Sequence, residues 1–395
     1  MNEFVNLYSL NVTRFILFKK MPENNRLFNA MMALLRVGLW QDAAVPADVV
    51  SSGACAAYFP LSPDEWKALY ALACEQAVVG VVWQGISSLP VQYMPPQAVV
   101  ARWVAHVDAI ERRNVAMDKA LASLLGLYRA NGIEPVILKG HTAAVNYPSP
   151  QLRQSGDIDI YFPSQAQRLK AEEILKDSGL EPVASADGST VFGWCGVTVE
   201  HHSTLFDLQH PRSRKIVEPI LARIENLCIS LRLNNELTVN ALAPYPNMLL
   251  LSTHVLKHAL GRGVGLRQLC DVAVAFNASR RNIDGREVRE LFASLGLERW
   301  SLLLHSFLVQ WLGLPPEALP WNDGKAVDTA PLMRIVQRGG NFGQYAGNGA
   351  PKGAVARKLG TAFSFLRNLG FCAKYAPGEA FYTFWQLLKG QCRRQ

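Results

Sequence analysis

Two features that this sequence lacks limit the classes of protein to which it can belong. No uncharged apolar run reaches the roughly 18 to 20 residues that a bilayer-spanning helix needs, because Glu75, Lys257 and Arg367 interrupt the most hydrophobic stretches. Residues 1–20 place their lysines after the apolar residues and lack a small-residue cleavage site, which is the wrong order for a secretory signal. The sequence therefore predicts no transmembrane segment, and residues 1–26 are expected to be a flexible leader.

Cysteine is scarce and scattered: the chain has seven, and none stands in a CxxC pair. This pattern argues against a disulfide framework and a zinc knuckle, and it favours reduced thiols in a cytoplasmic protein. Charged residues make up only 18% of the chain against 49% hydrophobic residues, which is typical of a folded globular protein. The net charge of +8 suits a polyanionic partner such as a nucleotide, an RNA or an anionic membrane surface.

Most of the chain has the apolar spacing of helices. Residues 27–132 form the expected N-terminal helical region, in which Ser62 opens a capping box and one long helix is expected over 97–130. Residues 244–338 form the C-terminal helical region, with helices expected over 246–260, 265–279, 284–295, 297–312 and 327–338. Residues 339–395 are expected to form a glycine-rich hinge and a basic amphipathic tail. The tail is expected either to pack on the rest of the protein or to contact a membrane or RNA.

Residues 133–243 interrupt the helical pattern and are predicted to form a compact core. Residues 135–139 are a short apolar run suited to a buried strand, and Pro148 stops the helical turn that follows it. Further strands are expected over 157–162, 181–186, 190–194 and 197–201, with a helix over 165–178. The predicted fold class is therefore α+β, with a small mixed β-sheet embedded between N-terminal and C-terminal mainly helical regions.

Two aspartates give this core its chemistry. In an extended segment residues i and i+2 point to the same face, so Asp157 and Asp159 project together while Ile158 turns to the core. Two ionised carboxylates on one face repel each other, and a divalent cation relieves the repulsion by accepting oxygen ligands from both. Mg²⁺, or Mn²⁺ in its place, also keeps positions for water and a substrate phosphate, so the pair predicts phosphoryl or nucleotidyl transfer.

Glu200 is the candidate for a third carboxylate. Residues 197–200 alternate apolar and polar side chains along a strand that could lie beside the one carrying Asp157. Its expected role is to ligate the metal and to take the proton from the acceptor hydroxyl. His202 lies two residues beyond it and is expected to orient Glu200, to contact phosphate or to be a hydrogen-bonded structural histidine.

A phosphate-binding segment precedes the aspartates. Gly140 lets the backbone approach a phosphate at a helix start, and Lys139 and Arg153 supply positive charge for a triphosphate. The candidates for nucleotide and phosphate binding are Lys139, Gly140, Thr142, Arg153, Ser155 and Gly156. Farther along, His254 and His258 stand at i and i+4 without the glutamate of a zinc protease, and they are expected to pack between regions or to line the acceptor site.

These segments together resemble the nucleotidyltransferases of the DNA polymerase β-like superfamily. The segments that carry the resemblance are 138–142 (LKGHT), 153–160 (RQSGDIDI) and 199–202 (VEHH). Weaker flanking motifs occur at 69–80, 254–258 and 266–271, so the resemblance spans about residues 27 to 345.

The resemblance implies a small mixed sheet flanked by helices that binds a nucleoside triphosphate such as ATP with Mg²⁺. A nucleoside monophosphate would pass to a hydroxyl on an RNA, protein, sugar or small molecule, with release of pyrophosphate. Carried onto this chain, the resemblance makes Asp157, Asp159 and Glu200 the catalytic metal ligands, and Gly140 with Thr142 the phosphate-binding turn. Two alternatives stay open: a DxD glycosyltransferase that uses a nucleotide-sugar, and a non-catalytic module that binds nucleotide or RNA.

Overall fold

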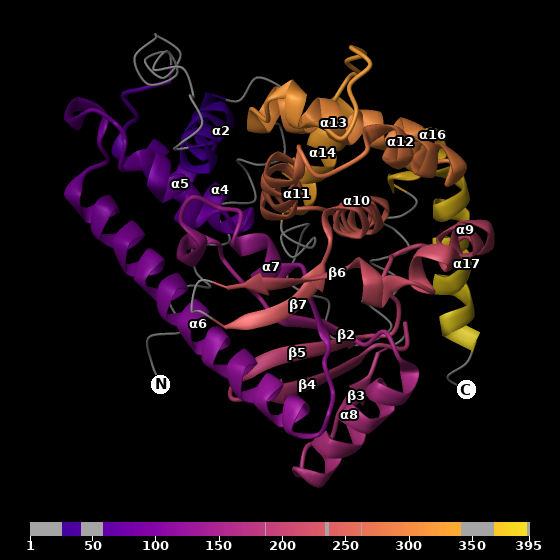
Figure 1. Ribbon diagram of the computed structural model, residues 1–395. Helices are drawn as coiled ribbons and strands as arrows, with labels where there is room; N and C mark the ends of the chain where they lie inside the picture. The colour runs from indigo at the N-terminus through magenta and orange to yellow at the C-terminus, as the bar shows by residue number, and fades with distance from the viewer. Residues whose placement is uncertain are drawn as a thin grey trace.

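The computed structural model describes most of the two helical regions and the core between them. The described residues are 26–40, 58–185, 187–233, 237–261, 263–340 and 367–392. Residues 1–25 of the predicted leader and 341–366 of the predicted hinge and tail lie outside them. Within the described residues the molecule is a mixed α+β structure, with one seven-stranded sheet flanked by helices (Figure 1). The predicted fold class is confirmed.

The sheet has the strand order β3-β4-β5-β2-β1-β7-β6. The strands are β1 (Val136–Leu138), β2 (Ile158–Tyr161), β3 (Val183–Ala184), β4 (Thr190–Trp194), β5 (Val197–His202), β6 (Cys228–Arg232) and β7 (Thr238–Leu242). The central strand β2 pairs antiparallel with β1 and parallel with β5. Within this register Asp159 of β2 stands opposite Glu200 of β5. The topology therefore brings two distant segments of the sequence side by side at the middle of the sheet.

Four elements of the core differ from the sequence-based expectation. The expected strand over 181–186 is reduced to β3, whose two residues are both exposed at the sheet edge. No strand was expected at β6 or at β7. β6 lies at the opposite edge and alternates poorly between buried and exposed positions, and β7 lies between it and β1. No helix was expected at α9 (Pro211–Leu221), because Pro219 interrupts the helical pattern from within. Edge strands and proline-containing helices carry weak apolar periodicity, so their sequences say little.

The helices agree more closely with the sequence. In the N-terminal half and the core they are α2 (Arg26–Leu39), α4 (Pro63–Glu75), α5 (Val79–Ile86), α6 (Gln97–Ala130), α7 (Gly140–Ala144), α8 (Gln165–Asp177) and α9. The later ones are α10 (Pro244–Leu260), α11 (Leu266–Ser279), α12 (Gly285–Ser294), α13 (Glu298–Leu312), α14 (Ala330–Gly339), α16 (Leu369–Tyr375) and α17 (Pro377–Cys392). At the start of α4, Ser62 and Glu65 cap each other reciprocally, as predicted. No helix among the described residues is long and apolar enough to cross a bilayer.

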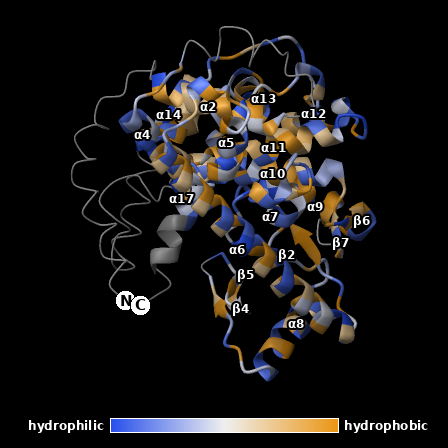
Figure 2. Ribbon diagram, turned by 90° about the vertical axis from the view of Figure 1, so that its left-hand side faces the viewer, coloured by the Kyte–Doolittle hydropathy of each residue, from blue (hydrophilic) through white to orange (hydrophobic). Residues whose placement is uncertain are grey.

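Two hydrophobic cores hold these layers together. The smaller one lies between the sheet, α8 and the C-terminal half of α6, and it includes Tyr128, Ile160 and Val199. The larger one joins the helices of the N-terminal and C-terminal halves. Trp40, which follows α2, donates a hydrogen bond of 2.6 Å from Nε1 to the carbonyl oxygen of Leu312 in α13. Figures 1 and 2 show the resulting helical layer on one side of the sheet and α8 at the opposite end.

Candidate active site

A pocket of about 170 Å³ lies where the central strands of the sheet meet α10 and α11. It is lined by Lys139, Gly140, Arg153, Gly156, Asp157, Asp159, Glu200, His202, Leu251, His254, Val255, Lys257, His258, Arg267, Gln268 and Asp271. The core supplies Asp157, Asp159 and Glu200, and the C-terminal helices α10 and α11 supply the opposite wall. The pocket is therefore lined by residues from two regions that lie far apart in the sequence.

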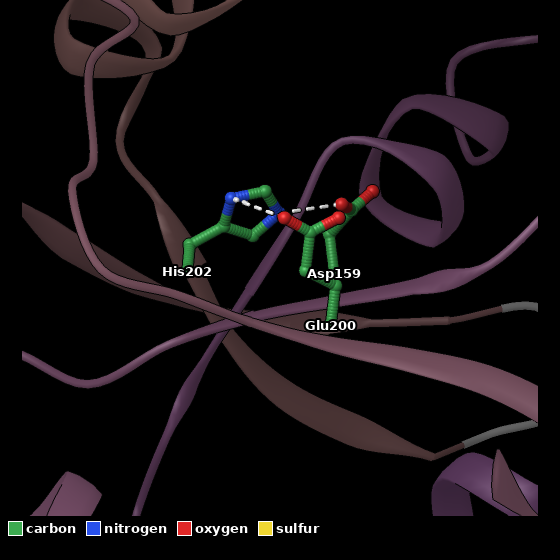
Figure 3. Close-up of side chains that lie close together, drawn as sticks. All are labelled: Asp159, Glu200 and His202. Atoms are coloured by element: carbon green, nitrogen blue, oxygen red, sulfur yellow. Dashed lines mark hydrogen bonds and ion pairs between the residues drawn. The ribbon is translucent and has the colours of Figure 1, made fainter. Parts of the chain in front are cut away.

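The centre of the pocket is a cluster of Asp159, Glu200 and His202 (Figure 3). His202 Nε2 lies 2.6 Å from Asp159 Oδ1, and His202 Nδ1 lies 3.6 Å from Glu200 Oε1. One ligand atom from each of the three residues lies within 4.8 Å of the others. Two carboxylate oxygens and an imidazole nitrogen this close together fit a divalent cation, with oxygen ligands suited to Mg²⁺ and the imidazole acceptable to Mn²⁺.

Asp157 lies just before β2 and lines the same pocket, although it does not belong to that tight group. Burial and the charge of Asp159 raise the pKa of Asp157, against the opposing charges of Lys139 and Arg267. Burial alone would also raise the pKa of Asp159, but the charge of Lys139 and the hydrogen bond with His202 outweigh it and lower that pKa. The environment therefore separates the proton affinities of the two aspartates, and Asp159 is the more firmly ionised.

Lys139 joins the end of β1 to the start of α7 and has φ of 44° and ψ of −120°. A non-glycine residue with this φ is strained by about 1 to 3 kcal/mol, which the surrounding structure must offset. Its Nζ lies 3.0 Å from Asp159 Oδ1 and 3.4 Å from His202 Nε2. The next residue, Gly140, has room for a side chain, since a Cβ there would lie 3.6 Å from the Asp157 carbonyl oxygen. The unusual backbone of this turn is thus at Lys139 and not at Gly140.

Arg153 is buried and holds a carboxylate of the C-terminal region. Its Nε and Nη2 donate to the two carboxylate oxygens of Asp271 at 2.8 and 2.7 Å. Tyr147 Oη donates to Asp271 Oδ1 at 2.7 Å, and Arg153 Nη1 donates to Ser155 Oγ at 3.2 Å. These hydrogen bonds connect α11 to the loop that precedes β2. Sequence reasoning missed the pair because its members are separated by 118 residues.

The pocket brings together most of the predicted site residues. Those that line it are Lys139, Gly140, Arg153, Gly156, Asp157, Asp159, Glu200 and His202. Thr142 and Ser155 do not line it: Thr142 Oγ1 donates to the carbonyl oxygen of Lys139 at 2.9 Å, and Ser155 accepts from Arg153. Their hydroxyls therefore support the turns on which the lining residues stand.

Asp207, which was not among the site residues expected from the sequence, contacts two pocket-lining residues of α10. Asp207 Oδ2 lies 2.9 Å from His254 Nδ1, and Asp207 Oδ1 accepts a hydrogen bond of 2.7 Å from Lys257 Nζ. Burial would raise the pKa of Asp207, but the bond from His254 and the charge of Lys257 hold it well below its usual range. No sequence pattern links Asp207 to α10, so only the fold reveals this cluster. His254 and His258 both line the pocket.

Comparison with known proteins adds one match. Residues 62–313 match a protein family described as an uncharacterised nucleotidyltransferase. Neither the curated proteins nor the solved structures with which the sequence was compared gave a match. The matched segment begins at the capping box of α4, contains the whole sheet and both walls of the pocket, and ends directly after α13. Since it covers more than half of the 395 residues, the chain belongs to this uncharacterised nucleotidyltransferase family.

Proposed function

We propose that the protein is a Mg²⁺-dependent nucleotidyltransferase, which transfers a nucleoside monophosphate from a nucleoside triphosphate to a hydroxyl acceptor and releases pyrophosphate. The observation that supports this best is the pairing of Asp159 with Glu200 across β2 and β5, inside a pocket that Asp157 also lines. Three carboxylates in a partly buried pocket need a compensating cation, and the family is one of nucleotidyltransferases.

Asp157, Asp159 and Glu200 are the proposed metal ligands, with His202 orienting them or adding its own nitrogen. The cation, when bound, would neutralise negative charge that develops on the phosphates during transfer, and Mn²⁺ could replace Mg²⁺. Asp159 Oδ1 now contacts both Lys139 and His202, so these two side chains must share it with the cation or release it.

The nucleotide side of the pocket is proposed to consist of Lys139, Gly140, Thr142, Arg153, Ser155 and Gly156. Lys139, once released from Asp159, carries a charge that can move to a phosphate oxygen. Arg153 contributes positive potential and holds Ser155, while its own hydrogen bonds are made to Asp271. Thr142 supports the backbone of the turn at Lys139 through its hydroxyl. The triphosphate is thus placed between the β1–α7 turn and the loop before β2.

We assign the catalytic core to residues 133–243, and the helical regions 27–132 and 244–338 to its support and acceptor wall. The scattered spacing of the seven cysteines, none of which stands in a CxxC pair, supports a cytoplasmic location. The acceptor is an RNA, a protein, a sugar or a small molecule, and the basic tail over 354–395 is proposed to contribute to contacts with it or with a membrane surface.

The test is to incubate the purified chain with each of the four nucleoside triphosphates and Mg²⁺, and to measure pyrophosphate release and label transfer to RNA, protein and sugars. The double variant Asp157→Asn/Asp159→Asn is expected to lose at least about 100- to 1,000-fold in rate, as when electrostatic stabilisers are removed from other active sites. Equal rates for wild type and variant would rule out the proposal. Nucleotide binding without turnover would favour the binding module, and preference for a UDP- or GDP-sugar would favour the glycosyltransferase.

A further inference from the structure

The wall on α10 contains a buried carboxylate–imidazole pair, Asp207 and His254, of which His254 lines the same pocket as the proposed metal ligands. Asp207 comes from the loop between β5 and α9, whereas His254 and Lys257 stand on one face of α10. Both carboxylate oxygens of Asp207 are bound, one by His254 and the other by Lys257. The exposed fractions of the Asp207 and His254 side chains are only 15% each. The imidazole is therefore held in one orientation.

The bond to Asp207 also determines where the proton of the imidazole lies. An ionised carboxylate can only accept, so Nδ1 of His254 must be the protonated nitrogen. Burial, followed by the charge of Lys139, lowers the pKa of His254 to about 4. The ring is consequently neutral at neutral pH, and Nε2 carries a free lone pair. Among the described residues, the hydrogen bond that His254 makes joins its Nδ1 to Asp207 Oδ2.

The charged and titratable groups around this ring come from several elements. Lys257 on the same helix lies 2.7 Å from Asp207 and 4.0 Å from Asp187, which precedes β4. His258, one turn along, stacks edge-on against His254 with ring centroids 4.6 Å apart, and burial first of all lowers its pKa well below the usual value. Lys139 faces the pair from the β1–α7 turn, and its charge influences both Asp207 and His254. Together, these neighbours oppose protonation of the ring more than Asp207 favours it.

We propose that His254 is a catalytic residue whose Nε2 accepts the proton of the acceptor hydroxyl, and that Asp207 is the residue that positions it. The inference rests on the proposed function. The hydroxyl oxygen forms the new bond to the α-phosphorus with its lone pair, and its proton moves to Nε2. The bond between the α-phosphorus and the bridging oxygen breaks, and pyrophosphate leaves with that electron pair. The acceptor thus enters along α10.

Glu200 was expected to take this proton, and we assign the step to His254 instead because Glu200 is a proposed metal ligand. A carboxylate that ligates a divalent cation is a weaker base, because the cation withdraws charge from its oxygens. Glu200 also lies beside His202, with 3.6 Å between Oε1 and Nδ1. His254 carries no metal-ligand duty in the proposed site. The pKa of His254, lowered to about 4, makes this ring a weaker base than a free imidazole, so the assignment rests on its place in the pocket and on the tautomer that Asp207 fixes.

The first experiment separates chemistry from nucleotide binding. In His254→Asn the amide nitrogen takes the place of Nδ1 and keeps the bond to Asp207, while the proton acceptor at Nε2 is lost. Pyrophosphate release from ATP and Mg²⁺, with glycerol as the hydroxyl compound, is expected to fall about 100-fold or more. Binding of ATP with Mn²⁺, measured by calorimetry, is expected to stay within about threefold of wild type, because the metal ligands are intact. His106→Asn is the matched control, since His106 bonds Tyr70 through Nδ1 between α4 and α6 and does not line the pocket.

Two outcomes of that experiment would overturn the proposal. A rate within about threefold of wild type would remove His254 from the chemistry. A parallel loss of ATP affinity and rate would make it a nucleotide-binding or structural residue. If wild type itself binds ATP but releases no pyrophosphate, the proposed function fails. The tautomer of the His254 ring, measured in the second experiment, then tests the inference separately.

The second experiment needs no turnover. In full-length protein with ¹⁵N-labelled histidine, NMR is expected to show His254 protonated at Nδ1 and unprotonated at Nε2 at pH 7. In Asp207→Asn, Lys257 should keep the amide oxygen and leave the amide NH₂ facing His254, which moves the proton to Nε2. A protonated Nε2 in wild type, or a tautomer unchanged by Asp207→Asn, would contradict the assignment. The expected pair of spectra would support it even without a known acceptor.

Discussion

The pocket contains two buried charged clusters that differ in how completely their charges are matched. Around Asp271, one guanidinium and one hydroxyl satisfy a single carboxylate with three hydrogen bonds. Around Asp159, the charges of Lys139 and Arg267 are shared among Asp157, Asp159 and Glu200, so three carboxylates stand against two cations. The first arrangement is complete in itself and connects two regions of the chain. The second would gain most from an added cation, and this difference separates structural charge from the charge that we propose to be catalytic.

The largest expected effect comes from breaking the complete cluster. In Arg153→Met the side chain of Asp271, which is only 7% exposed, loses its cation. Removing one partner of a buried ion pair typically costs about 3 to 5 kcal/mol, so the free energy of unfolding should fall by that amount. Urea denaturation followed by circular dichroism measures it.

Arg153→Lys is the matched control for that loss. It keeps the charge but not the two-pronged geometry, so it should lose less stability than Arg153→Met. Added Mg²⁺ should restore neither variant, because the cation site lies at the other cluster. A loss below about 1 kcal/mol in Arg153→Met would contradict the structural role of this pair.

A smaller effect is expected at the incomplete cluster. Lys139→Met keeps the length and the strained backbone but leaves Asp159 with His202 as its remaining close partner. Without metal the variant should lose about 2 to 3 kcal/mol, the cost of an uncompensated buried charge. With Mn²⁺ it should recover more stability than wild type gains, because the ion no longer competes with an ammonium. Thermal unfolding with and without Mn²⁺ tests this, and an equal gain in both proteins would refute the competition.

The smallest effect concerns His201, which lies between Glu200 and His202 but packs on the other face of β5. Its ring is fully buried, and Nε2 lies 2.9 Å from Tyr128 Oη. Burial, more than its charged neighbours, lowers the pKa of His201 to about 3, against about 6.5 in an unfolded chain. Between these values the unfolded chain binds a proton that the folded chain does not, so this residue makes stability fall as the pH falls below about 6.5.

Replacing His201 by phenylalanine should remove that dependence. Stability at pH 7.5 drops by about 1 kcal/mol, because Tyr128 loses its partner. From pH 7.5 to pH 5 the variant should lose about 2 kcal/mol less than wild type does, given the two pKa values. Urea unfolding at both pH values checks this. An unchanged dependence would show that other groups control acid sensitivity.

The part of the site that lies on regular strands could be predicted, and the part that depends on tertiary pairing could not. The alternation around Asp159 and Glu200 identified both carboxylates, because a side chain's face follows directly from strand period. The long helix α6 was equally clear, since its apolar spacing continues from Gln97 to Ala130. Asp207 and Asp271 carry no such local signal. Their partners lie 47 and 118 residues away, so only the folded chain identifies them.

The two walls of the pocket come from different kinds of element, and this has a consequence for how substrate choice can evolve. The carboxylates stand on hydrogen-bonded strands, where a shift in one residue disturbs its neighbours. The opposite wall consists of side chains on α10 and α11, which can change by point substitution while the helix backbones stay in place. The proposed catalytic site can therefore be adapted to new acceptors through these two helices, without rebuilding the strands that would bind the nucleotide.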